Sequence, residues 1–243
     1  MENILPSKPS GISSKLVRTG IVLAALILIG GLSLFTFVWL SGGSGQPSGD
    51  LNTIAPLQLT ETQTLFRLVA AESEVRFVIQ ETLLGMPTTV VGVTNQVAGE
   101  IGVDLNSPAK SQLGGIRINV RTLKTDNEIR NRALRGQILH SNEDQYEFAV
   151  FTPTKLIGLP ETNQVGVLPK FQIEGVLALH GVSHSVTFEA EITTLAAARI
   201  TGRAVATIAY RDFKVSIPAV AGVANVGETV RLEIDFTAIS HAS

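Results

Sequence analysis

The sequence predicts a mainly β protein: an eight-stranded antiparallel barrel with one helix between strands 3 and 4, preceded by a single N-terminal transmembrane helix. Apolar and polar residues alternate along several segments after residue 59, most regularly between Phe171 and Ile192. Such alternation is typical of a strand with one enclosed face and one face in water. Eight strands of this kind favour closure, because a closed sheet has no unpaired edges. The transmembrane helix is predicted because residues 20–40 contain no charged side chain.

The apolar N-terminal segment is expected to anchor the protein in the cell membrane. About 20 residues at a rise of about 1.5 Å each span a hydrocarbon core of about 30 Å, and residues 19–40 are long enough. Basic residues precede this run and the next charge is Asp50. This bias predicts a cytoplasmic tail over residues 1–18 and an extracytoplasmic barrel, with the membrane crossed once by residues 20–40. A cleavable signal peptide is the alternative, although its apolar core usually has only about 7–15 residues.

Residues 41–58 are expected to form a flexible linker, and residues 59–243 the barrel domain. The linker is rich in Gly, Ser and Pro, as flexible tethers are. The chain has no cysteine, which excludes disulfides, thiolate metal sites and a cysteine nucleophile. Its formal net charge of −2 gives no reason to expect a nucleic acid partner. The oligomeric state is left open.

Eight segments after the linker have the pattern of strands. They are residues 66–80, 90–104, 116–122, 146–156, 167–180, 185–195, 200–211 and 230–239. A helix is expected over residues 126–139, because Thr125 and Glu128 have the spacing of a capping box and apolar residues follow at helical intervals. A barrel of this size either fills its interior with side chains or holds one slender ligand. The aromatic content of only 5% leaves room for a ligand.

A series of short motifs follows in order from Phe66 to the end of the chain. They are Ser73-x-Val75-x-Phe77-x-Ile79, Val91-Gly92, Gly99-x-Ile101, Arg121-Thr122-Leu123-x-Thr125, Arg130-Asn131, Tyr146-x-Phe148, Gly175-x-Leu177-x-Leu179-His180-Gly181-Val182-Ser183, Arg211-Asp212-Phe213 and Val226-Gly227-Glu228. This order resembles the YceI-like domain, a family of lipocalin-like eight-stranded barrels that bind polyisoprenoid chains in an elongated apolar cavity. Two polar positions depart from the family pattern: Glu72 stands before Ser73 without the usual histidine, and Asn131 replaces an aspartate.

The resemblance implies that the barrel binds a polyisoprenoid or another long apolar lipid, with no catalytic residue, cofactor or metal. A prenyl chain offers only methyl and methylene surface, so its affinity depends on buried apolar area. The candidates for contacting it are Val75, Phe77, Ile79, Ile116, Ile118, Leu177, Leu179, Val186 and Phe188 on strands, with Leu134 and Ile138 on the helix closing one end. The alternative is that these side chains simply pack against one another.

Basic side chains near the helix are candidates for contacting the headgroup of a ligand. The headgroup candidates are Arg121, Arg130, Arg135 and His180. Such a cluster at the barrel mouth would meet a pyrophosphate or an anionic lipid headgroup. A solvated helix face is the alternative. His180 and His184 flank a turn between strands instead of sharing a helix face, so no metal site is expected from them.

Two other functions remain open at this stage. One is an enzyme that acts on an isoprenoid substrate with Arg121, Arg130 and His180 at the barrel mouth. The other is an envelope stress or scaffold module whose barrel is packed shut and whose partner is a protein.

Overall fold

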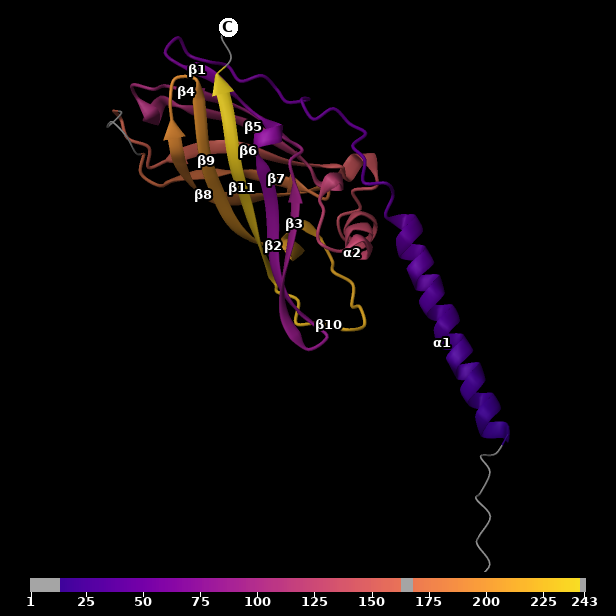
Figure 1. Cartoon of the computed structure of the whole chain (residues 1–243). Helices are drawn as coiled ribbons and strands as arrows, with labels where there is room; N and C mark the ends of the chain where they lie inside the picture. The colour runs from indigo at the N-terminus through magenta and orange to yellow at the C-terminus, as the bar shows by residue number, and fades with distance from the viewer. Residues whose placement is uncertain (1–13, 163–167, 241–243) are drawn as a thin grey trace, which may run out of the picture.

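The computed structural model describes residues 14–162 and 168–240. Hydrogen bonds between strands of these residues build one antiparallel sheet that closes into a barrel, and a long helix projects away from it (Figure 1). The predicted mainly β class, the closed eight-stranded barrel and the short helix between strands 3 and 4 are therefore confirmed.

Two of the eight barrel strands are each divided into two pieces. The pieces are β1 (Thr64–Leu68) with β2 (Glu74–Leu83), and β3 (Met86–Thr94) with β4 (Val97–Val103). Both pieces of the first strand pair with the last strand, β11: β1 with residues 238–240 and β2 with residues 231–235. The undivided strands are β5 (Gln112–Asn119), β6 (Phe148–Ile157), β7 (Phe171–Leu179), β8 (Val182–Leu195), β9 (Arg199–Ala209) and β11 (Thr229–Ser240).

The barrel closes in the order β1-β4-β5-β6-β7-β8-β9-β11, with β11 pairing back to β1. The β2–β3 hairpin extends this wall, and the short β10 (Val223–Ala224) pairs with β2. Among the described residues β3 has no strand partner besides β2, and its other edge makes a single bridge from Val93 to Lys124. Short helical turns connect the strands: η1 (Ala70–Glu72), η2 (Pro108–Lys110), η3 (Val120–Thr122), η5 (Asp144–Tyr146) and η6 (Tyr210–Phe213).

The connection from β5 to β6 carries α2 (Glu128–Ala133), which continues as a π turn, η4 (Leu134–Ile138). Asn127 caps α2, because its side-chain oxygen accepts hydrogen bonds from the backbone N–H groups of Ile129 and Arg130 at 2.9 and 3.1 Å. The predicted capping box is therefore wrong. The Thr125 hydroxyl donates to the Asn131 side chain at 2.8 Å instead. An asparagine directly before the first helical residue is at least as good a cap as threonine.

Helix α1 (Ser14–Ser41) covers the predicted membrane span with 28 residues in one continuous helix. Within the part of the chain that the structure describes, no helix was identified as long and apolar enough to cross a membrane. Residues 1–13 of the predicted cytoplasmic tail lie outside the described residues. The C-terminal end of α1 contacts α2: the Arg132 guanidinium lies 3.6 Å from the centre of the Trp39 ring and donates to the Trp39 carbonyl at 2.6 Å.

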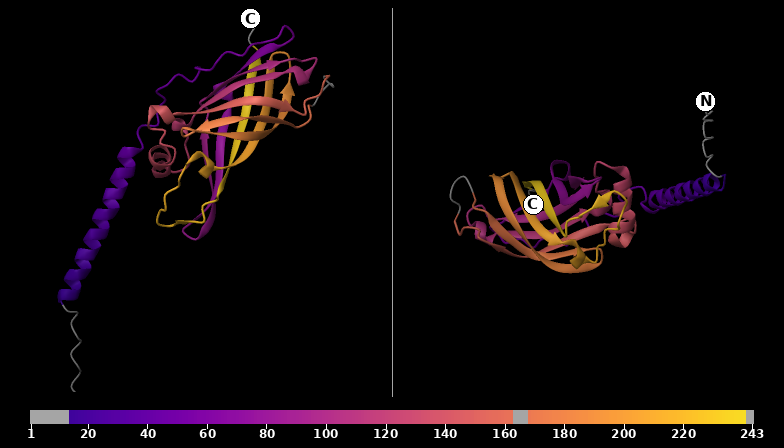
Figure 2. Two further views of the ribbon diagram at one scale, coloured as in Figure 1. Left: turned by 180° about the vertical axis from the view of Figure 1, so that it is seen from behind. Right: turned by 90° about the horizontal axis from the view of Figure 1, so that it is seen from below.

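The segment predicted as a linker runs along the outside of the barrel from α1 to β1 (Figures 1 and 2). We call residues 42–58 the strap. The backbone N–H and hydroxyl of Ser48 donate to the Glu147 carboxylate at 2.9 and 2.7 Å, and the Leu57 N–H donates to Glu100 at 3.0 Å. The strap is thus hydrogen-bonded to Glu147 before β6 and to Glu100 on β4, and its predicted flexibility stays a prediction.

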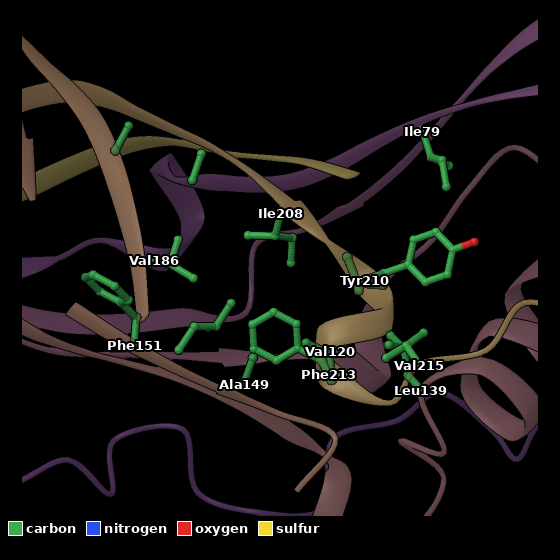
Figure 3. Packing of buried hydrophobic residues seen from close by; sticks show 14 of the residues in the cluster. Ile79, Val120, Leu139, Ala149, Phe151, Val186, Ile208, Tyr210, Phe213 and Val215 are labelled. Carbon is green, nitrogen blue, oxygen red and sulfur yellow. The ribbon is translucent and has the colours of Figure 1, made fainter. Parts of the chain in front are cut away.

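Apolar side chains inside the barrel form two clusters of unequal size. The smaller one lies where β1 and β11 meet and contains Phe66, Val103, Ile200 and Ala238. The larger one lines most of the rest of the interior and includes Phe151, Tyr210 and Phe213 (Figure 3).

Candidate functional site

The barrel contains a cavity of about 560 Å³, and the cavity wall is almost wholly apolar. This volume falls within the range of about 300–1,000 Å³ that is common for sites of small organic ligands. The sequence allowed either a barrel filled by its own side chains or a barrel with room for a ligand. The structure has unfilled space and therefore agrees with the second alternative.

Ten of the eleven apolar candidates lie on the cavity wall. They are Val75, Phe77, Ile79, Ile116, Ile118, Leu134, Ile138, Leu177, Leu179 and Phe188. The strand residues among them come from β2, β5, β7 and β8, where alternate positions face the interior. Their contact with a ligand stays a prediction, but the structure brings them together around one space.

Val186 is the candidate that does not lie on the wall, although it is buried. It pairs with Gly175 across β7 and β8. The Phe151 ring occupies the space above that glycine: a Cβ built on Gly175 would lie 2.4 Å from the ring. Phe151 and Val186 lie on the same side of the cluster (Figure 3). Val186 therefore packs in the core next to this ring, away from the open space.

The sequence interpretation missed the part of the wall formed by β9, β11 and the segment between them. The residues are Ala204 and Ile208 on β9, Val230, Leu232 and Ile234 on β11, and Val215, Ile217, Pro218, Val220 and Val226 between the strands. The two strands carry the same alternation as the others, so that signal was available. The connecting segment has no periodic pattern that reveals which side chains face inward.

Arg130 is the one predicted headgroup residue on the cavity wall. It projects from α2 and forms ion pairs with Glu81 on β2 at 3.2 Å and with Asp126 at 2.5 Å. Glu81 also lies on the wall, two positions beyond Ile79 on the inward face of its strand. The positive charge of Arg130 is therefore compensated by the carboxylates of Glu81 and Asp126.

Arg121 is buried outside the cavity, in a group of polar residues that we call the strap network. The network consists of Ser48, Asn119, Arg121, Asp144 and Glu147. The Arg121 guanidinium donates to the Ser48 hydroxyl at 2.6 Å and to Asp144 at 2.8 Å, and lies 3.3 Å from Glu147. Arg121 thus fastens the strap to the β5–β6 connection.

Both carboxylates of the strap network are held in the charged form. Burial of Glu147 opposes ionisation, but hydrogen bonds from Ser48, Asn119 and Gly49 outweigh burial and lower its pKa. Hydrogen bonds from Arg121 and Ser48, together with the charge of Arg121, lower the pKa of Asp144. The network is therefore an ionic one at neutral pH.

Arg135 and His180 also lie away from the cavity wall. Arg135 is buried and donates to the Gly42 carbonyl at 2.7 Å. His180 lies in the turn between β7 and β8, where its ring stacks on His140 at 5.2 Å and contacts Tyr146 at 5.1 Å. The structure thus does not bring the four predicted headgroup residues together on the cavity wall, because nearness along the chain does not fix the directions in which side chains point. Their contact with a headgroup stays a prediction.

The charged residues that border the cavity are paired within the protein. They are Glu81, Asp104 and Arg130, together with Arg76 and Glu233. The side chains of Arg76 and Glu233 lie on the outer face of β2 and β11, because these positions alternate with inward-facing ones. Arg76 lies 3.1 Å from Glu233, and Asp104 accepts a hydrogen bond from the Thr62 hydroxyl at 2.7 Å, which lowers the pKa of Asp104. Within residues 14–162 and 168–240, no group of three or more His, Cys, Asp or Glu side chains has the arrangement of a metal site.

Comparison with known proteins places the barrel in a family. The crystal structure of BcnA from Burkholderia cenocepacia is similar, with a TM-score of 0.54 and 18% identity over 70% of this chain and 98% of that one. A polyisoprenoid binding domain from Saccharophagus degradans, implicated in plant cell wall breakdown, has a TM-score of 0.51 and 17% identity over 72% and 98% of the two chains. No curated protein sequence matches this chain. Residues 66–238 match the YceI-like domain, and the chain therefore belongs to the YceI-like domain family.

Proposed function

We propose that this protein binds a polyisoprenoid or a similar long apolar lipid inside its barrel. The observation that carries the proposal is the cavity inside the barrel with its almost wholly apolar wall. Each Å² of apolar surface removed from water contributes about 25 cal/mol, so a ligand made of methyl and methylene groups gains from such a wall. A polar ligand would lose hydrogen bonds to water without replacing them. The relative from Saccharophagus degradans, a polyisoprenoid binding domain by its printed name, supports the same class.

We further propose that the barrel works at the outer face of the cytoplasmic membrane, held there by residues 20–40. The support is the uncharged run in the sequence and the basic residues that precede it. A tether raises the local concentration of a binding domain, which suits a ligand that resides in a membrane.

The enzyme alternative gains no support from the geometry. It required Arg121, Arg130 and His180 together at the mouth, whereas only Arg130 lies on the cavity wall. Binding, sequestration or transport therefore describes the proposed function better than turnover.

The test is native mass spectrometry of the full chain purified from its native membranes in detergent, followed by identification of the bound molecules. We expect one apolar lipid at near-unit occupancy. Ala204→Phe, which places a ring in the cavity, should release it. Thr207→Phe on the outer face of the same strand is the matched control and should retain it. An empty barrel in repeated native preparations contradicts the proposal.

A further inference from the structure

Tyr210 places a hydroxyl in the apolar cavity. It is the one tyrosine on the described wall, and only 7% of its surface is exposed. It lies at the start of η6, directly after β9. Figure 3 shows its ring reaching away from Phe151 and Val186, on the side of the cluster where Ile79 lies.

The Tyr210 hydroxyl has no hydrogen-bond partner among the described residues. Its ring packs in the larger apolar cluster, and the Arg211 guanidinium lies 5.9 Å from the ring centre. Within the part of the chain that the structure describes, Tyr210 is not one of the residues with a fully enclosed polar atom that lacks a partner, so its hydroxyl keeps a surface open to the cavity. An oxygen acceptor on a ligand at this position would form a hydrogen bond that the almost wholly apolar wall does not supply. The Tyr210 hydroxyl can thus donate a hydrogen bond to a ligand, whereas packing of the ring alone does not require a hydroxyl.

The charges on the same wall disfavour an anionic ligand. Apart from Arg76 and Glu233, which face outward, the wall has the carboxylates of Glu81 and Asp104 and the guanidinium of Arg130. Arg76 is paired with Glu233, and Arg130 lies between Glu81 and Asp126. A pyrophosphate in the cavity would find no unpaired cation among the described wall residues, and an uncompensated buried charge is costly.

We propose that the ligand has an uncharged polar end, a hydroxyl or carbonyl oxygen that accepts a hydrogen bond from Tyr210. The chain would then select neutral prenyl lipids over prenyl phosphates. This inference rests on the proposed function, since it takes the cavity as the lipid site. Tyr210 is the residue that determines the specificity for the headgroup.

Three probes with the same prenyl chain test the inference on the full-length protein, stripped of lipid and held in detergent micelles. They are farnesol, farnesyl diphosphate and the hydrocarbon farnesene, with Kd measured by calorimetric titration. The wild type should bind farnesol at least about tenfold more tightly than the diphosphate, because the wall offers no free cation. Tyr210→Phe should weaken farnesol binding about three- to tenfold and leave farnesene unchanged.

Tyr146→Phe is the matched control, because Tyr146 contacts His180 and does not lie on the wall. It should change none of the three affinities. If the wild type binds the diphosphate as tightly as farnesol, the inference is overturned, and this result needs no variant. If Tyr210→Phe weakens farnesol and farnesene equally, Tyr210 acts by packing, and the proposed lipid binding stands without the inference. If none of the probes binds, both fail.

Discussion

The cavity wall and the buried part of the strap network, Asn119, Arg121 and Glu147, are both withdrawn from water, yet they are built from opposite chemistry. The wall consists of apolar side chains around a space of about 560 Å³. The strap network consists of charged and polar groups that satisfy one another, with Glu147 only 1% exposed. The buried ion pair of Arg121 and Glu147 therefore lies outside the barrel interior. The barrel interior remains free for an apolar guest, while the network holds the strap in place.

The largest expected effect comes from removing the central carboxylate of the strap network. Glu147→Ala leaves Arg121 without its buried partner and should lower the free energy of unfolding by about 3 kcal/mol. Urea unfolding of the full chain measures this. Glu189→Ala on the exposed face of β8 is the control and should change stability by less than about 0.5 kcal/mol. Equal effects of the two substitutions would show that the network does not stabilise the fold.

A pair of core substitutions separates the wall from the packed interior. Leu177→Ala should lower the free energy of unfolding by about 2 kcal/mol, the low end for such changes, because the side chain borders a cavity that already exists. It should also weaken lipid binding. Val186→Ala is buried off the wall and should lower stability by about 1 kcal/mol without changing lipid affinity. Unfolding curves and lipid titrations of both variants check this; weaker lipid binding in Val186→Ala would contradict the assignment.

Acid should weaken the strap network through its buried carboxylate. Since the folded-state pKa of Glu147 is lowered, its contribution to stability is complete above its unfolded pKa of about 4.3. That contribution is lost as the pH falls through the lower folded value. Stability should therefore be level from about pH 7 to about pH 5 and decline below about pH 4. Glu147→Gln should flatten part of this decline in urea unfolding between pH 3 and pH 7. An unchanged acid profile in that variant would assign the decline to other carboxylates.

The smallest change in stability and lipid affinity is expected from substituting the charged wall residue Arg130. Arg130→Gln removes a partly exposed ion pair with Glu81 and should cost at most about 1 kcal/mol of stability. The affinity for a neutral prenyl lipid should change by less than about threefold, because such a ligand needs no cation. Complete loss of binding in a calorimetric titration would assign Arg130 to the headgroup after all.

The wall was largely predictable from the sequence, and the strap network was not. Alternation identifies which strand residues face inward, so residues such as Phe77 and Leu177 were placed correctly. The network joins Ser48 to Glu147 across 99 positions, and contacts of this range leave no periodic trace. Arg121 was predicted at the mouth because of its neighbours in sequence, while the 3-10 turn η3 directs it into the network. Tyr210 was missed because its significance depends on the cavity around it.

The two edges of β3 differ in hydrogen bonding, and this difference affects how fast its amide hydrogens exchange with water. Its amide groups bond to β2 on one side, while the described residues give its other edge only the bridge from Val93 to Lys124. Such an edge opens by local fluctuations of low free energy, without unfolding of the whole sheet. Hydrogen exchange should therefore be fastest along β3 and slowest from β7 to β9.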